Sequence, residues 1–267
     1  MASLRPRNTS MAKQLEPEDP RTWDMSEDAI MTPSGGLLWH WRAFRCRKQW
    51  RDFLERIELW LSEWQPQSNH LLLMGPSAGW CLPDSFLIRF KTIIAVDIDP
   101  LAHFFFRRLH GSALNQSGTK LVWRRTNLFR DLESLLREYP QHAVLFPNVL
   151  GQHIFHEPDE ARLRQDIKTL GERLKNRNWA SFHDRLSGDW NPALPMPASF
   201  EAIRALTAAD LAEKLGLSGE WLDHMTDAVL PPDTERMFAP WPIIPDWIHW
   251  VEFGSVAGIE RGKPDER

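Results

Sequence analysis

Apolar residues along the chain gather in short runs that are separated by amphipathic segments. Two of these runs, 71–74 and 93–96, contain no polar positions, as expected for strands buried on both faces of a parallel sheet. Similar runs predict three further strands, at 120–124, 142–147 and 179–183. Apolar positions at helical spacing predict helices at 41–64, 101–110, 131–138, 158–176 and 207–215.

The order of these elements, strand and helix in alternation, predicts an α/β fold with a doubly wound, mostly parallel sheet. Residues 247–256 alternate between apolar and polar positions, which predicts an antiparallel edge strand. We expect a flexible N-terminal arm at 1–36 and a single domain at 37–262. The proline-dense segment at about 189–245 is expected to be an irregular cover on the substrate side.

A turn of small residues, Gly75-Pro76-Ser77-Ala78-Gly79, follows the first apolar run, and Asp97 follows the second. Ligands of a parallel sheet bind beyond the carboxyl ends of its strands, so we expect the turn and the acid at one crevice. Glycines let the backbone approach a ligand, and a helix expected behind the turn offers unpaired N–H groups. Asp97 is placed to accept both hydroxyls of a ribose. The alternative is a plain βαβ unit whose glycines only form the turn.

The spacing of the turn discriminates between ligand families. A nicotinamide-type fingerprint has glycines where Ser77 and Trp80 stand here, and the Gly-Lys-Ser/Thr of a phosphate-binding loop is absent. The chain instead resembles the class I S-adenosylmethionine-dependent methyltransferases. In that family an apolar strand precedes a G-x-G/S-x-G turn, and the next strand often ends in V-D-x-D/S-P. Residues 75–79 and 96–100, VDIDP, match these two motifs.

The resemblance implies a seven-stranded sheet and transfer of a methyl group from S-adenosyl-L-methionine to an oxygen, nitrogen or carbon nucleophile. It implies that the cofactor is bound by Gly75, Ser77, Gly79, Asp97, Ile98, Asn127, Leu128 and Asn148. Asn127 would hydrogen-bond the adenine amine. The acceptor would meet Asn148 and three residues given catalytic roles, His153, His183 and Asp184. Met74 departs from the family, because many members have an acid at this position.

Two other functional classes fit parts of the sequence. Gly75-x-Ser77-x-Gly79 is also the nucleophile elbow of an α/β-hydrolase, and Asp184 and His249 follow in the order of that triad. The several strands that precede the elbow in that fold are missing from residues 1–70. A non-catalytic binding protein on a methyltransferase-like fold is the third hypothesis.

Composition narrows the partners. The chain has 267 residues and a net charge of −4, so it has no global basic field for nucleic acid, and a small-molecule acceptor is favoured over nucleic acid or protein. Two cysteines, no signal-like leader and no long uncharged apolar run predict a cytoplasmic protein without a membrane span. No metal site is predicted, because Cys46 and Cys81 are not in ligand spacing. His40, ahead of the first helix, is a candidate for a lid over the site.

Overall fold

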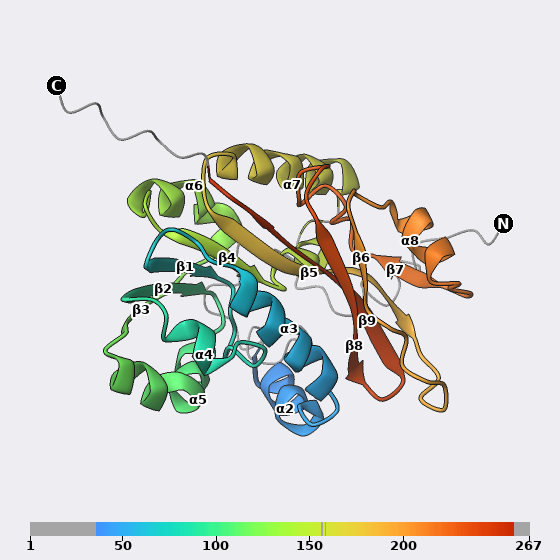
Figure 1. Ribbon diagram of the computed structural model, residues 1–267, viewed down its shortest axis with the longest axis horizontal. Helices are drawn as coiled ribbons and strands as arrows, with labels where there is room; N and C mark the ends of the chain where they lie inside the picture. The colour runs from blue at the N-terminus through green and yellow to red at the C-terminus, as the bar shows by residue number, and fades with distance from the viewer. Residues whose placement is uncertain (1–35, 156, 158, 259–267) are drawn as a thin grey trace.

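The computed structural model describes residues 36–155, 157 and 159–258, so the predicted arm at 1–36, except Gly36, lies outside the described residues. Within these limits the chain forms one mixed sheet of nine strands with helices on both faces (Figure 1). The strands are β1 (His70–Met74), β2 (Thr92–Asp97), β3 (Lys120–Arg125), β4 (Ala143–Pro147), β5 (Trp179–Asp189), β6 (Phe200–Ala202), β7 (Trp221–Asp223), β8 (Arg236–Ile244) and β9 (Trp247–Val256). The helices are α2 (Gly36–Cys46), α3 (Arg51–Glu63), α4 (Asp84–Leu87), α5 (Ala102–Ser117), α6 (Leu128–Glu138), α7 (Glu160–Leu174), α8 (Ala208–Lys214) and the 3₁₀ helix η3 (Leu150–Phe155).

The first five strands lie in the order β3-β2-β1-β4-β5, and all five are parallel. β1 is central: Leu72 pairs with Ile94 of β2 on one side and with Val144 of β4 on the other. Nearly every residue of these three strands is buried, which explains why the runs lack alternation. The carboxyl ends of β1, β2 and β4 therefore meet at one edge of the sheet, where the small-residue turn and Asp97 lie.

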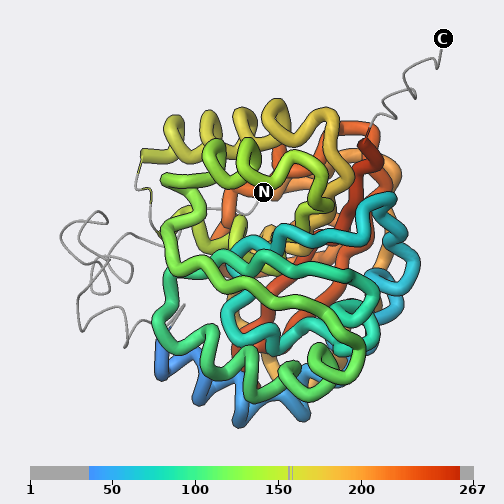
Figure 2. The backbone as a smooth tube through the Cα atoms, turned by 90° about the vertical axis from the view of Figure 1, so that its left-hand side faces the viewer, coloured from blue at the N-terminus to red at the C-terminus, as the bar shows by residue number. Residues whose placement is uncertain are grey.

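Helices cover the two faces of the sheet and bury its apolar side chains. On one face α2, α3, α4 and α5 pack over Leu71, Leu73 and Ile93. On the other face α6 and α7 pack over Leu72 and Ile94. Figure 2 shows this layering from the side, with α6 and α7 above the sheet and α2 and α5 below it. Each fully buried leucine stabilises the fold by about 1.5–3 kcal/mol relative to an exposed one.

The second half of the sheet is antiparallel. β9 pairs with β5 along its length and with β8 on its other side, and β6 pairs with the outer side of β8. The predicted α/β class, a parallel core with antiparallel C-terminal strands, is confirmed. The described residues contain nine strands rather than seven, because β6 and β7 have three residues each and are too short to leave a sequence pattern. β9, expected at the edge, lies between β5 and β8.

Part of the proline-dense segment is a regular strand, which corrects the expectation of an irregular cover. β8 contains Pro240 and Pro242, which pair with Trp250 and Ile248 of β9. Alternate residues direct their N–H groups to the same side of a strand, so both missing donors fall on one side. β6 pairs only with the first three residues of β8, so along the prolines no strand of the described residues lies on the side opposite β9. The prolines therefore remove no bond that the sheet needs.

Two helix predictions also need correction. The helix predicted at 41–64 is two helices, α2 and α3, separated by a turn at residues 47–50. The helix expected directly behind the glycine turn is the four-residue α4, which begins five positions after Gly79. Pro83 precedes α4 and the N–H of Leu82 is bonded to the carbonyl of Gly79, so the turn tightens before a helix can start. The turn therefore has no long helix N-terminus behind it.

Candidate functional site

The turn after β1 and the acid after β2 are directly bonded to each other. The backbone N–H of Ser77 donates to Asp97 Oδ2 at 2.6 Å, and the N–H of Asp99 donates to Asp97 Oδ1 at 2.9 Å. The N–H of Gly75 donates to the carbonyl of Val96 at 2.7 Å. The bonds from Ser77 and Gly75 thus join the end of β1 to the end of β2, and we call the surface made by residues 75–79 and 97–99 the rim.

The rim carries two carboxyl groups whose pKa values are shifted in opposite directions. Burial raises the pKa of Asp97 to about 6, although the backbone N–H groups of Asp99 and Ser77 lower it. Burial acts in the same direction on Asp99, but a hydrogen bond from His40 and the N–H groups of Leu101 and Gly36 hold its pKa below the ordinary value. Asp99 is therefore a fixed anion, whereas Asp97 is poised to change charge in mildly acidic solution.

Gly75 has a positive φ of 66° and lies against the residue that follows Asn148 at the end of β4. A Cβ built at Gly75 would stand 2.4 Å from Val149 Cγ2, which is closer than any van der Waals contact. Glycine is needed here twice, for its backbone conformation and for the close approach of β1 to the β4 loop. Ser77 also has a positive φ, of 51°, which is uncommon for a residue with a side chain.

Helix α2 covers the rim. The indole N–H of Trp39 donates to Ser77 Oγ at 3.0 Å, and His40 Nε2 lies 3.2 Å from Asp99 Oδ2. The indole of Trp80 donates to His40 Nδ1 at 3.0 Å, which leaves the His40 proton on Nε2, facing Asp99. The N–H of Gly36 also donates to Asp99 at 2.8 Å. His40 therefore lies over the rim, where a lid residue was expected, but within α2 rather than ahead of it.

The other predicted cofactor residues lie at the ends of β2 and β3. Asn127 caps α6, and its Oδ1 accepts from the N–H groups of Phe129 and Arg130 at 3.0 and 3.3 Å. Its amide oxygen is thus already used twice, so a contact with an adenine amine would compete with the cap. The side chain of Leu128 is buried in the core beneath α6 and α7. Ile98 is half-buried, and its carbonyl accepts from Arg125 Nε at 3.4 Å.

Asn148 and Asp184 are brought together by two hydrogen bonds. Asn148 Nδ2 donates to Asp184 Oδ2 at 3.1 Å, and the N–H of Asp184 donates to Asn148 Oδ1 at 3.0 Å. Asn148 has a positive φ of 62°, which asparagine tolerates better than most residues. β4 pairs with β5 as far as Phe182, and β7 pairs with β5 from Leu186 onward. Asp184 therefore lies between the part of β5 that pairs with β4 and the part that pairs with β7. At this position β5 is bonded to the side chain of Asn148 instead of to a strand.

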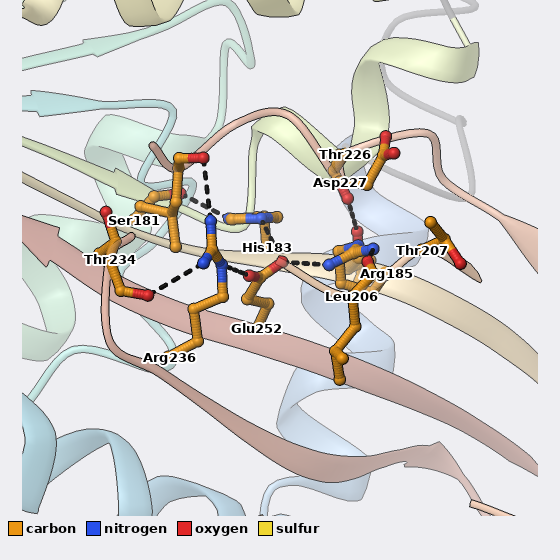
Figure 3. A network of polar contacts seen from close by, with 12 residues as sticks. Ser181, His183, Arg185, Leu206, Thr207, Thr226, Asp227, Thr234, Arg236 and Glu252 are labelled. Carbon is orange, nitrogen blue, oxygen red and sulfur yellow. Dashed lines mark hydrogen bonds and ion pairs between the residues drawn. The ribbon is translucent and has the colours of Figure 1, made fainter. Parts of the chain in front are cut away.

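His183 and Asp184 were both expected to meet the acceptor, but the structure places them on opposite faces of β5. Neighbouring residues of a strand point to opposite faces. His183 Nδ1 lies 3.0 Å from Ser181 Oγ, and its Nε2 lies 3.4 Å from Glu252 Oε2 (Figure 3). The side chains of His183 and Asp184 are both buried. The structure therefore does not bring His183 to Asp184 or to Asn148.

The partners of His183 belong to a buried charged network shown in Figure 3. Glu252 is ion-paired with Arg185 and with Arg236. The two guanidinium groups also donate to carbonyl oxygens, those of Leu206, Leu230, Pro231, Pro232 and Thr234. Burial raises the pKa of Glu252, but Arg185 and His183 lower it to about 2, so this carboxylate is charged at every ordinary pH. The arrangement ties β5, β8 and β9 together.

His153 lies on η3 and faces α6 and α7. Its ring stacks on Phe129 with centroids 4.1 Å apart, and its Nε2 lies 3.1 Å from Asp166 Oδ2 on α7. Burial lowers the pKa of His153. The carboxylate of Asp166 raises this pKa, but by less. The ring borders a cavity of about 260 Å³ between α6 and α7. None of its recorded partners among the described residues belongs to the rim.

Asp184 lies on the other face with two histidines that came from distant segments. His249 Nδ1 of β9 is 3.0 Å from Asp184 Oδ1. His224, just after β7, has its ring 5.7 Å from that of His249, centroid to centroid. Burial raises the pKa of Asp184, but His249 and His224 hold it below its ordinary value. Burial lowers the pKa of His224.

Asp184 and His249 are the acid and base that the hydrolase hypothesis named. The structure therefore shows one of the contacts that this hypothesis requires. A triad also needs the base to reach the nucleophile. Ser77 Oγ accepts from the indole of Trp39, and no histidine among the described residues is hydrogen-bonded to it. His249 instead faces Trp241, with ring centroids 6.0 Å apart.

Two features of the site were missed by sequence reasoning. His224 stands in an irregular segment, where no periodicity assigns it a face, so nothing local marked it. Glu252 left a signal: in the alternating strand 247–256 it falls between the apolar residues Trp250 and Gly254 on the face opposite His249. A charged residue on a strand face that is otherwise apolar indicates a buried partner of opposite charge.

Comparison with known proteins gives similarity of fold only. No protein-family profile matches the chain, and no curated protein matches it. The chain is similar to the N-methyltransferase NodS from Bradyrhizobium japonicum, with 13% identity, 92% of this chain and 97% of that chain covered, and a TM-score of 0.39. It is similar to an O-methyltransferase family protein from Burkholderia thailandensis, with 14% identity, 82% and 59% coverage, and a TM-score of 0.41.

A third solved structure, monomeric WbdD, is 14% identical, and the match covers 53% of this chain and 32% of that chain with a TM-score of 0.37. The chain thus spans about a third of that protein's length. Similarities at these scores do not bear on the chemistry. The features of this chain that bear on its function are the strand order β3-β2-β1-β4-β5, with antiparallel strands beyond β5, and the geometry of the rim. Among the described residues, no helix has the length and apolarity that a membrane span requires.

Proposed function

We propose that the protein binds S-adenosyl-L-methionine at the rim and transfers its methyl group to a small-molecule acceptor. The observation that carries the proposal is the hydrogen bond between the Ser77 N–H and Asp97. A nucleoside whose ribose hydroxyls bind a carboxylate, and whose remaining part follows a glycine turn, needs these two elements within one ligand length. In this protein they are in direct contact.

The cofactor-binding residues of the proposal are those of the rim and of the neighbouring strand ends. Asp97 accepts the ribose hydroxyls, each oxygen having a lone pair beyond the one used by the backbone. Gly75, Ser77 and Gly79 let the backbone approach the methionine and sugar. Ile98 flanks the adenine with its side chain and Leu128 with its backbone, because the Leu128 side chain is buried in the core. Asn127 contacts the adenine through its amide nitrogen, since its oxygen caps α6. Helix α2, held by Trp39 and His40, excludes water from the bound cofactor.

The acceptor in this proposal lies beyond the ends of β4 and β5, next to Asn148 and Asp184. The sulfonium methyl is already activated, so the protein has to align donor and acceptor and to exclude water. Gly75 touches Val149, which places the cofactor turn against the loop that carries Asn148. Asp184 is the predicted catalytic residue that is hydrogen-bonded to Asn148. His153 and His183 contribute through their partners, Asp166 and Glu252, by fixing η3 and β5.

Parallel calorimetric titrations with S-adenosylmethionine, S-adenosylhomocysteine and NAD test the class of ligand. The proposal predicts binding of the first two and none of NAD. A fluorophosphonate probe tests the rival class, because an α/β-hydrolase serine reacts with it and Ser77 of a methyltransferase does not. Binding of the cofactor without methylated product across a panel of hydroxyl and amine acceptors would favour the non-catalytic hypothesis. Covalent labelling of Ser77 together with no cofactor binding would overturn the proposal.

A further inference from the structure

Asp184, which the proposed methyl transfer places beside the acceptor, forms a cluster with His224 and His249, to which that proposal gives no role. They come from β5, from the residue after β7 and from β9, and one potential ligand atom of each lies within 4.8 Å of the others. Figure 1 shows β7 and β9 beside β5. Asp184 and His224 are almost fully buried, whereas the side chain of His249 is 13% exposed. Asp184 and His224 therefore close the cluster from solvent on their side, and solvent reaches the cluster past His249.

A bulge in β5 builds this cluster. Asp184 pairs with Val251 and Leu186 pairs with Trp250, so the register shifts by one residue between them. As a result Asp184 and Ser187 point to the same face of the sheet, although three positions apart they would normally face opposite ways. Ser187 pairs with His249, which shares that face. Bulges of this kind commonly redirect a side chain at a functional site.

Asp184 Oδ1 and His249 Nδ1 form an ion pair at 3.0 Å, and neither atom has a hydrogen-bond partner of good geometry among the described residues. Leaving a buried carboxylate oxygen without a donor is costly. Two ligands bound to one ion at about 2.1 Å, at angles between tetrahedral and octahedral, are separated by roughly 3.0–3.4 Å. The observed separation fits an ion between the two atoms.

The outer partners of Asp184 and His224 orient these two side chains as metal ligands are oriented. His224 Nδ1 lies 2.7 Å from the carbonyl of Gly151, which only accepts, so the ring proton is on Nδ1 and the lone pair is on Nε2. Asp184 Oδ2 is held by Asn148 Nδ2, which leaves Oδ1 for an ion. A histidine whose second nitrogen donates to a carbonyl is the usual arrangement around a bound metal. The hydroxyl of Ser187, 3.0 Å from His224 Nε2, is the competing partner.

From this geometry we infer that Asp184, His224 and His249 bind one divalent first-row transition-metal ion such as Zn²⁺ or Mn²⁺. Two imidazole nitrogens and one carboxylate oxygen favour these ions over Mg²⁺, which prefers six oxygen ligands. Three protein ligands leave coordination positions open, and the exposed side of His249 gives access to them. The inference stands independently of the proposed methyl transfer, because the ligand atoms and their outer partners are all in the protein.

Metal binding to the full-length, chelator-treated protein tests the inference directly. We expect one equivalent of Zn²⁺ or Mn²⁺ per chain by titration calorimetry and elemental analysis, and much weaker binding of Mg²⁺. Co²⁺ should give the visible absorption of an ion with nitrogen ligands. His249→Ala and Asp184→Asn should each weaken Zn²⁺ binding at least about tenfold. His103→Ala is the matched control, because His103 is exposed and lies on α5, and it should leave the affinity unchanged.

The result does not depend on how well the variants fold, because the wild-type titration alone can overturn the inference. Absence of stoichiometric binding of Zn²⁺, Mn²⁺ and Co²⁺ to the wild type does so. Binding that His249→Ala and Asp184→Asn leave unchanged, with circular dichroism showing folded variants, also does so, because it places the ion elsewhere. Neither result would affect the cofactor titration, which is made without metal.

Discussion

The N–H of Ser77 and the Oδ2 of Asp97 are 2.6 Å apart, so the residue in the middle of the glycine turn is bonded to the acid that ends the next strand. These residues are 20 positions apart in the chain and meet because β1 and β2 are parallel neighbours. Asp97 is only 8% exposed, and Trp39 of α2 covers Ser77 from above. The rim is thus a preformed, enclosed polar site, and its behaviour can be predicted from Asp97.

Cofactor affinity should depend on the ionisation of Asp97. Burial raises the pKa of this carboxyl to about 6, so it is charged at pH 7.5 and mostly neutral at pH 5. Affinity for S-adenosylhomocysteine should fall by up to about tenfold between these two pH values, because a neutral carboxyl accepts the ribose hydroxyls less well. Calorimetric titration at each pH measures the change. Asp97→Asn should abolish the pH dependence, and a dependence that survives in this variant would assign it to another group.

The same raised pKa predicts how stability varies with pH. The folded protein holds the Asp97 proton more tightly than the unfolded chain, so this carboxyl contributes stability that is fully present below its ordinary pKa and is lost as the pH rises through about 6. The difference amounts to about 3 kcal/mol. Urea unfolding of wild type and Asp97→Asn from pH 4.5 to 7.5 should show this slope only in the wild type. Parallel curves for the two proteins would contradict the assignment.

Gly75 should tolerate no side chain. In Gly75→Ala the new methyl would lie 2.4 Å from Val149 Cγ2, in addition to the strain of a positive φ. Gly118→Ala is the matched control, because its φ is 74° and no atom of the described residues lies within 4 Å of the added Cβ. The control should lose about 1–2 kcal/mol of unfolding free energy and Gly75→Ala about 1–3 kcal/mol more, measured by urea unfolding. Adding Val149→Ala to Gly75→Ala should recover part of the loss, and no recovery would mean that the clash is not the cause.

Glu252 should hold the antiparallel half of the sheet together. Its pKa is lowered to about 2 despite burial, by Arg185 and His183, so its stabilisation is present above the ordinary pKa of about 4.5 and is lost as the pH falls toward 2. Glu252→Gln leaves two buried guanidinium groups without their carboxylate and should cost about 3–5 kcal/mol at pH 7. Glu138→Gln, which changes an exposed ion pair with Arg124, should leave the urea midpoint unchanged. Equal midpoints for both variants would show that the network contributes no stability.

The rim could be predicted from the sequence because its parts are local. An unbroken apolar run, a glycine turn and a terminal acid each occupy a few consecutive residues, and parallel pairing brings them together without further information. Helix α2 could not be placed over Ser77, since that contact depends on how α2 packs against β8.

The contacts of Asp184 with the strands beyond β5 were less predictable, for physical reasons. Asp184 and His249 are 65 positions apart, and their contact depends on a one-residue bulge that no sequence pattern marks. The same alternation along β5 separates His183 from Asp184, although both stand at the predicted strand end. β8 was missed because its two prolines argue against a strand, and only the absence of a neighbour on their side permits them.

The central claim, that Asp97 binds the ribose of S-adenosylmethionine, is tested most directly by titrating that cofactor into three proteins at pH 7.5. These are the wild type, Asp97→Asn and Asp52→Asn, the last making the same chemical change at an exposed aspartate on α3. We predict that Asp97→Asn weakens binding by about 10- to 100-fold, the range for hydrogen bonds to a charged group, and that Asp52→Asn matches the wild type. Equal affinity in all three proteins, or no binding to the wild type, would contradict the claim.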